Sequence, residues 1–171
     1  SGDPIADAAT VDPEPEQKDQ GDVDTACAAP DSPTVAESKY RPVFLYFNEN
    51  VRGLTVDHLH TIDLQETVGQ YGYVLEGVAF LTYRTAPAGG VELYRCYNFG
   101  TGDHSVSRDA NCGGQTNEGP VGWILPDYAD GHTLLVQCKS ESYDELMATI
   151  DPRACTDNGY AIVEVLGWVV R

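Results

Sequence analysis

The sequence has little positive charge and no long apolar run. Ten lysines and arginines stand against 27 aspartates and glutamates, which gives a formal net charge of −17. Because no stretch of the chain concentrates basic residues, nucleic acid and anionic lipid are excluded as partners. The longest apolar run, AIVEVLGWVV (161–170), is short and contains Glu164, so direct membrane insertion is also excluded.

Aromatic residues are absent from positions 1–39, although the chain contains 10 Tyr, 4 Phe and 2 Trp. The same segment carries half of the ten prolines and ten acidic residues against two lysines. Such a composition cannot bury enough apolar surface to fold, so we expect an acidic Pro-rich tail or stalk over 1–39 and one domain over 40–171. The chain begins at Ser1 without methionine, which leaves two explanations: a leader or lipid anchor removed before Ser1, or a shortened chain.

The domain contains an internal repeat of roughly forty to fifty residues. Runs typical of strands occur at VFLYFN (43–48), LYRCYN (93–98) and LVQCKS (135–140), and they are followed by DHLHTID (57–63), DHSVSRD (103–109) and ELMATID (145–151). Each unit is then expected to close on a glycine, at Gly72, Gly122 and Gly159, with an aromatic residue after it. We therefore predict three units, at about 40–86, 87–131 and 132–171.

Four cysteines follow the same period. Two lie in the second unit and two at corresponding places in the third, which predicts the disulfides Cys96–Cys112 and Cys138–Cys155. Each disulfide would close a loop and stabilise the fold by roughly 3 kcal/mol. Disulfides also indicate an oxidising compartment. Tyr46 stands where the first cysteine of the first unit would be. Cys27 is left unpaired in the tail, either as a free thiol or as a link between two chains.

At this point the residues carry a resemblance. LYRCYNFGTGDH (93–104), GYVLEGVAF (72–80) and RDANCGGQTNEGPVGWIL (108–125) resemble a secreted repeat family with YRxYN, GDHFYT and GWxxEGxAxYV units, found on bacterial and fungal extracellular proteins. The resemblance covers 40–171 and implies a secreted or cell-surface module that binds carbohydrate or cell-wall polysaccharide. The chain departs from the pattern after His104 and at Pro126 and Asp127.

The units predict a mainly β fold. Four short strands in each of three units would close as a β-trefoil-like, pseudo-threefold domain. Three ββαβ-like units are the alternative, because SESYDELMAT (140–149) has helical spacing. Tyr73, Trp123 and Tyr160 recur after the closing glycines and are expected to fill the core around the pseudo-threefold axis.

The candidate ligand-binding residues are polar or aromatic side chains near the Asp-His turns, since aromatic rings stack on sugars and carboxylates accept hydrogen bonds from their hydroxyl groups. They are Asp57, His58, Tyr94, Tyr97, Asp103, His104 and Tyr128.

Three chemical alternatives were weighed against that site. His58 and His60 share one face of a strand and could bind zinc with Asp57, although the second unit places a histidine at an equivalent turn position. Ser105 or Ser107, His104 and Asp103 could form a hydrolase triad, but neighbours on a strand face opposite ways and no GxSxG turn is present. Acid pairs such as Asp57 and Asp63, or Asp127 and Asp130, suit a solvated surface or a weak calcium site better than a glycosidase.

The sequence therefore predicts a lectin-like binding module and no enzyme, with calcium as the one cofactor to consider. The alternative is a structural adhesin or filament subunit that forms homo-oligomers through its N-terminal extension and Cys27.

Overall fold

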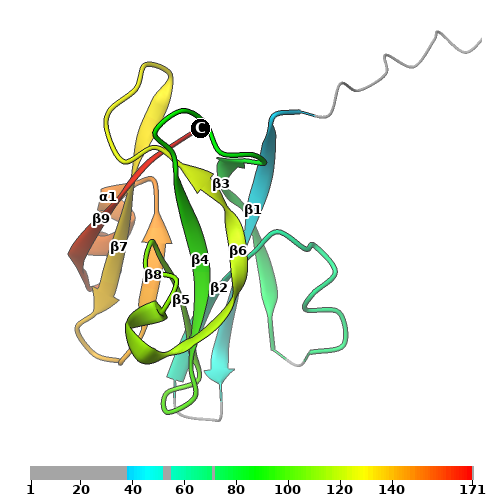
Figure 1. The fold of residues 1–171 in the computed structure, drawn as a ribbon. Helices are drawn as coiled ribbons and strands as arrows, with labels where there is room; N and C mark the ends of the chain where they lie inside the picture. The colour runs from blue at the N-terminus through cyan, green and yellow to red at the C-terminus, as the bar shows by residue number, and fades with distance from the viewer. Residues whose placement is uncertain (1–37, 52–54, 71, 171) are drawn as a thin grey trace, which may run out of the picture. The chain divides into compact units, whose positions relative to one another are not determined.

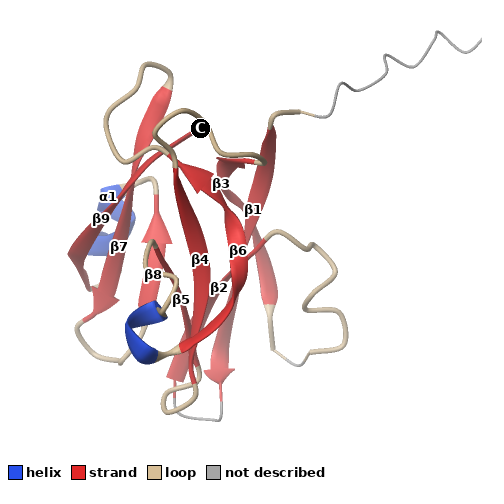
Figure 2. Ribbon diagram, viewed as in Figure 1, coloured by secondary structure: helices blue, strands red, loops and turns tan. Residues whose placement is uncertain are grey.

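The computed structural model describes residues 38–51, 55–70 and 72–170. Predictions for residues 1–37, including Cys27, lie outside this described part. The described residues are mainly β, as the sequence predicts (Figure 2). The strands are β1 (Tyr40–Val51), β2 (Thr55–Thr61), β3 (Val74–Tyr83), β4 (Val91–Asn98), β5 (Asp103–Ser107), β6 (Thr116–Ile124), β7 (His132–Ser140), β8 (Leu146–Thr149) and β9 (Tyr160–Val170). A short 3-10 helix, η1 (Cys112–Gly114), precedes β6, and the helix α1 (Pro152–Asp157) precedes β9.

One pairing pattern occurs three times along the chain. In each case a central strand pairs antiparallel with the strand that follows it and with the next one: β1 with β2 and β3, β4 with β5 and β6, and β7 with β8 and β9 (Figure 1). We call these sets the first, second and third units. Each unit has three strands where four were expected, because the residues after Glu76 and Gly77 continue β3 rather than beginning a new strand.

Each unit also carries two irregularities in its pairing, at matching places. The register between the central and third strands shifts after Val43, Leu93 and Leu135, and again after Leu45, Arg95 and Gln137. At the second shift one residue of the third strand has no partner opposite it: Glu76, Glu118 and Val163, respectively. Such bulges bend a strand and redirect the side chain of the extra residue. The two glutamates therefore occupy equivalent places in the first two units.

The third strands of the units meet one another. Tyr83 of β3 pairs with Trp123 of β6, Leu81 of β3 pairs with Val170 of β9, and Leu125 bridges to Trp168. The core lies beneath this junction and is formed by apolar residues from all three units: Val43, Phe80, Leu93, Val106, Val121, Ile124, Leu135, Ala148, Leu166 and Val169.

Gly122 and Gly167 allow the backbones at this junction to approach closely. A Cβ atom on Gly167 would lie 2.5 Å from the carbonyl oxygen of Leu125, and the positive φ of 144° also disfavours any other residue. Gly122 is in the same situation against Thr82.

The predicted alignment of closing glycines is wrong in the second unit. Gly72 and Gly159 stand just before β3 and β9, but Gly122 lies within β6. The glycine that corresponds to them is Gly114, which precedes β6 with a φ of 91°, beside 94° and 76° at the other two. The shared aromatic core of Tyr73, Trp123 and Tyr160 is therefore wrong as well, because Trp123 occupies a different place in its unit.

The helical spacing of SESYDELMAT (140–149) is also misleading. Ser140 ends β7, and the segment turns back so that Leu146 pairs with Lys139 and Met147 with Cys138. Cross-strand pairing and burial of Met147 outweigh the helical periodicity. The helix follows instead at 152–157, where Asp151 caps it by accepting a hydrogen bond from the Arg153 N–H. The third unit thus has the ββαβ order that the alternative fold predicts.

Both predicted disulfides are present. Cys96 of β4 joins Cys112 of η1 with a Cα separation of 5.6 Å, and Cys138 of β7 joins Cys155 of α1 at 6.0 Å. Each disulfide ties a central strand to the connection between the second and third strands. In the first unit the Tyr46 hydroxyl makes the corresponding link, since it donates a 2.7 Å hydrogen bond to the Leu64 carbonyl oxygen.

Candidate functional site

Three buried acidic residues occupy matching places in or next to the second strands. Asp57 lies within β2, Asp103 begins β5 and Glu145 directly precedes β8, and their exposed fractions are 0, 6 and 0%. Each accepts a hydrogen bond from the residue that follows the acid of another unit: Asp57 from His104, Asp103 from Leu146, and Glu145 from His58. The acids therefore link the three units in a closed cycle, which we call the carboxyl ring.

Asp57 is the most extensively bonded member. Its Oδ1 accepts the backbone N–H of His104 at 2.7 Å, while Oδ2 lies 2.8 Å from Nδ1 of His104 and 2.5 Å from the Tyr73 hydroxyl. Burial alone would raise the pKa of Asp57, but the hydrogen bonds and charge of His104 outweigh it and hold the pKa below its usual value. Asp57 is therefore ionised and fixed between two units.

Asp103 has the opposite electrostatic character. Burial, together with the nearby Glu145 carboxylate, raises the pKa of Asp103 to about 9. Its Oδ1 accepts a hydrogen bond of 3.3 Å from the backbone N–H of Leu146 in the third unit. At neutral pH Asp103 therefore carries a proton, which reduces repulsion among the acids of the ring.

Glu145 bonds to His58 across the first and third units, with Oε1 2.5 Å from Nδ1. Its Oε2 has no hydrogen-bond partner among the described residues. Burial and then the neighbouring Glu145 raise the pKa of Tyr160. His60 lies deeper, where its Nε2 contacts the Ala148 carbonyl oxygen at 2.9 Å and burial lowers its pKa to about 4. His60 is therefore neutral at physiological pH.

The geometry does not favour the metal and triad alternatives. Nδ1 of His58 and Nε2 of His60 are directed to Glu145 and to a backbone carbonyl, and the described part of the chain holds no cluster of three metal-ligating residues. His104 contacts Asp57 of another strand rather than its neighbour Asp103. These residues consequently join strands.

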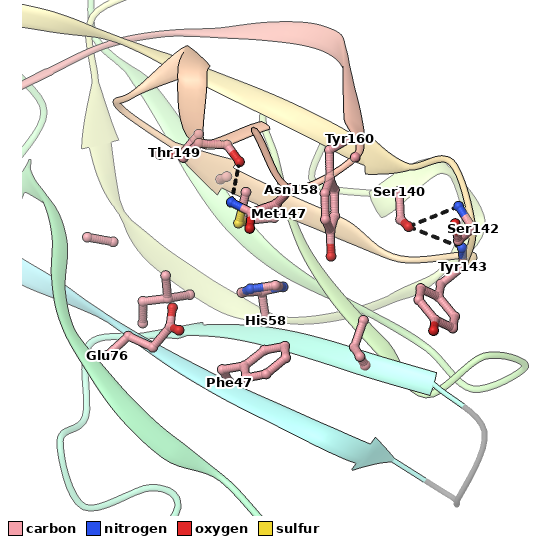
Figure 3. A pocket seen from close by; sticks show the side chains of 16 residues that line it. Phe47, His58, Glu76, Ser140, Ser142, Tyr143, Met147, Thr149, Asn158 and Tyr160 are labelled. Atoms are coloured by element: carbon pink, nitrogen blue, oxygen red, sulfur yellow. Dashed lines mark hydrogen bonds between the residues drawn. The ribbon is translucent and has the colours of Figure 1, made fainter. Parts of the chain in front are cut away.

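A cavity of about 480 Å³ lies beside His58, between the first and third units. Figure 3 shows Phe47, His58 and Glu76 on one side of it, with Tyr160 and residues of the third unit on the other. The ring centroids of Phe47 and His58 are 4.8 Å apart, and those of His58 and Tyr160 are 6.2 Å apart. The remaining lining residues are Leu45, Val56, Ala79, Ser140, Ser142, Tyr143, Met147, Ala148, Thr149, Ala154, Asn158 and Gly159.

Local structure explains why these side chains meet. Phe47 and His58 are cross-strand partners on β1 and β2. Tyr160 begins β9 directly after the left-handed Gly159, and Glu76 is the bulge residue of β3. Ser140 accepts hydrogen bonds from the N–H groups of the turn that follows it, and this turn holds Tyr143 at the rim with half of its surface exposed.

A second cleft, of about 300 Å³, lies between the first and second units. Lining residues of this cleft match residues of the first cavity: Glu118 corresponds to the bulge residue Glu76, Arg95 to Leu45 and Val121 to Ala79. Arg95 forms a bidentate pair with Glu66, at 2.6 and 2.7 Å, and its Nε donates to Glu118 at 2.8 Å. In this cleft the guanidinium group of Arg95 therefore occupies the space between Glu66 and Glu118.

One protein-family profile matches residues 21–124, which is more than half of the chain. The chain belongs to the family described as "Domain of unknown function (DUF5648)". The DUF5648 match ends at Ile124, the last residue of β6, so it includes the first two units and stops before the third. No curated protein and no solved structure matches the chain.

Of the ligand-binding residues predicted for this DUF5648 chain, His58 alone lines the cavity. Asp57 and Asp103 belong to the carboxyl ring, and His104 is bonded to Asp57 of that ring. The three tyrosines lie elsewhere: Tyr94 donates to Glu92, Tyr97 packs on Phe99 and His104, and Tyr128 is 67% exposed beside Trp168. Ligand contacts of these tyrosines stay a prediction.

The sequence analysis missed Glu76, Tyr143, Asn158 and Tyr160 as a group. The sequence predicts a core position for Tyr160, and Glu76 enters the sequence analysis only as a letter of GYVLEGVAF (72–80). Glu76 could have been recognised by its equivalence to Glu118. That equivalence depends on the positions of the β-bulges, which the sequence alone does not show.

Proposed function

We propose that this domain is a non-enzymatic, lectin-like carbohydrate-binding module of an extracellular or cell-surface protein, and that the cavity beside His58 is its binding site. The observation that carries the proposal is the combination of aromatic rings with hydrogen-bonding groups around one cavity. Phe47, Tyr143 and Tyr160 offer faces for the apolar side of a sugar ring, while Glu76 and Asn158 offer polar groups for its hydroxyls. The cavity volume suits one or two sugar residues.

Location outside the cell is part of the same proposal. The two disulfides suit an oxidising compartment. The partner we propose is a glycan or cell-wall polysaccharide. A secreted chain or one lipid-anchored before Ser1 would each bring the cavity to such a surface.

A pseudo-threefold, trefoil-like relation among the units is the finer proposal about the fold. The threefold recurrence of strand pairing and bulges supports it, as does the cyclic bonding of Asp57, Asp103 and Glu145. On this view the cavity beside His58 and the cleft beside Arg95 are two versions of one inter-unit position.

Binding of the oxidised full-length chain to an array of glycans and cell-wall polysaccharides tests the function. Tyr143→Ala should weaken saturable binding about tenfold without a change in melting temperature, because the ring lies half-exposed at the rim. Tyr128→Ala is the matched control, since it removes an exposed tyrosine outside the cavity. Parallel arrays with and without calcium test whether the acidic turns contribute.

Loss of binding in Tyr128→Ala with normal binding in Tyr143→Ala would move the site from the cavity to Tyr128, one of the ligand-binding residues predicted from the sequence. A blank array with both disulfides intact would contradict carbohydrate binding altogether. The size of the full-length chain under non-reducing conditions would then test the alternative of a structural subunit linked through Cys27.

A further inference from the structure

The charged groups around the cavity are predominantly acidic. Glu76 is the one acidic side chain that lines it, and the described lining residues include no lysine or arginine. Glu145 stands directly behind His58 and adds negative potential from a fully buried position. The nearest cations of the third unit are committed elsewhere, since Lys139 pairs with Asp144 and Arg153 with Asp151. A ligand with a positive group would therefore meet complementary charge, and an anionic sugar would be repelled.

The second cleft shows what a glutamate at this bulge position does within the same fold. There Glu118 accepts a hydrogen bond from the Arg95 guanidinium at 2.8 Å. In the first cavity the position of Arg95 is taken by Leu45, which has no charge to offer. Among the described residues no ion pair is recorded for Glu76, so the space that a cation fills in the second cleft is open to a ligand in the first.

The aromatic residues favour the same kind of ligand. The faces of tyrosine and phenylalanine attract cations as well as the apolar faces of sugars, and this attraction strengthens where water is excluded. In Figure 3 Phe47 lies next to Glu76, Tyr160 lies on the opposite wall, and Tyr143 lies at the far end of the cavity from Glu76. An ammonium group next to a sugar ring would satisfy the carboxylate and the rings together.

We infer that the cavity selects an amino sugar with a free ammonium group, as in β-linked glucosamine oligosaccharides, over its N-acetylated counterpart. This inference rests on the proposed function and specifies its ligand class. Glu76 is the specificity-determining residue, because its carboxylate can form an ion pair with the ammonium group, whereas the acetamido group of the N-acetylated sugar carries no charge.

The test is calorimetric titration of the full-length chain, at physiological ionic strength, with a glucosamine hexasaccharide and with its fully N-acetylated form. We expect the wild-type chain to bind the glucosamine form about tenfold more tightly, which is the gain of one charge-assisted hydrogen bond. Glu76→Gln should abolish this preference while weak binding of both sugars persists.

Glu118→Gln is the matched control, because it removes the same charge from the equivalent position of the second cleft. If a polycationic sugar bound only through the net charge of −17, its affinity would fall equally in the two variants. Equal responses, or a preference that survives Glu76→Gln, would overturn the inference. Tight binding of the N-acetylated sugar that Tyr143→Ala weakens would overturn the ammonium selectivity and leave carbohydrate binding standing. No binding of either sugar to the wild-type chain would overturn the inference, and the glycan array would then decide whether the proposed function holds for other carbohydrates.

Discussion

At the scale of single residues, the most informative feature is that the acids of the carboxyl ring are chemically different. Asp57 is held ionised by His104 and Tyr73, whereas Asp103 is held protonated by burial beside Glu145. Three ionised carboxylates packed together would repel one another strongly in a low-dielectric interior. The ring therefore depends on one neutral member, and the identity of that member has a measurable consequence for stability.

Asp103→Asn is expected to stabilise the protein at alkaline pH. The folded state holds the Asp103 proton up to a pKa of about 9, while an unfolded aspartate releases it near its ordinary value of 3.8. The contribution of Asp103 to stability is thus fully present below pH 3.8 and is lost as the pH rises towards 9. The amide keeps the acceptor for the Leu146 N–H and has no proton to lose.

Urea unfolding of both chains from pH 5 to pH 9 measures this effect. The free energy of unfolding of the wild-type chain should fall more steeply with pH, and the variant should be more stable by about 2 kcal/mol at pH 8. Parallel curves for the two chains would show that Asp103 is not the proton-holding member. His60 makes the free energy of unfolding rise with pH in the acid range, because its pKa of about 4 lies below its ordinary value. This contribution is the same in both chains, so it does not affect their comparison.

At the scale of elements, the connections between the second and third strands distinguish the three units. The same place is fixed by Tyr46 and a hydrogen bond in the first unit, by a disulfide to η1 in the second, and by a disulfide to α1 in the third. The third connection is the one next to the cavity, where Ala154 and Asn158 belong to the lining. The two disulfides should therefore have equal effects on stability and unequal effects on binding.

Cys138→Ala/Cys155→Ala and Cys96→Ala/Cys112→Ala form the matched pair for this prediction. Their sequence separations are 17 and 16 residues, so each should lower the free energy of unfolding by about 3 kcal/mol. Saccharide affinity should fall several-fold in the first variant, because α1 is no longer tied to β7, and should be unchanged in the second. Equal losses of affinity, measured by titration below the melting temperature of both variants, would argue that the third unit does not form the site.

The elements also explain how much could be predicted from the sequence. The disulfides and the equivalence of Asp57, Asp103 and Glu145 could be predicted from the sequence. The internal repeat is preserved at these positions because the residues are fixed by disulfide bonds or by their positions in or next to the second strands. The helix was misplaced because residues 140–149 have helical spacing but are held by pairing with β7. Gly122 was misaligned because the bulges of β6 shift the register, and a register shift leaves no mark on composition.

At the scale of the whole described part, 38–51, 55–70 and 72–170, the two described cavities lie in the spaces between units. The mainly β class followed from the strand patterns, but the candidate site did not, because its residues come from β1, β2, β3 and the segment from β7 to β9. Such a cavity depends on which units pack together, and that packing is long-range. Asp57 and Asp103 attracted attention as surface ligands, yet they are buried in the contacts that position the cavity.

The central claim is that the cavity between the first and third units binds saccharide, and its most direct test is the substitution Leu45→Arg. This change copies the arrangement of the second cleft, where an arginine at the equivalent position bonds to the bulge glutamate. The new guanidinium should pair with Glu76 and occupy the space beside Phe47 and His58. We predict that Leu45→Arg abolishes saturable saccharide binding while the melting temperature stays within a few degrees of the wild-type value. Wild-type affinity in a folded Leu45→Arg chain would contradict the account, because the ligand would then bind at a site other than this cavity.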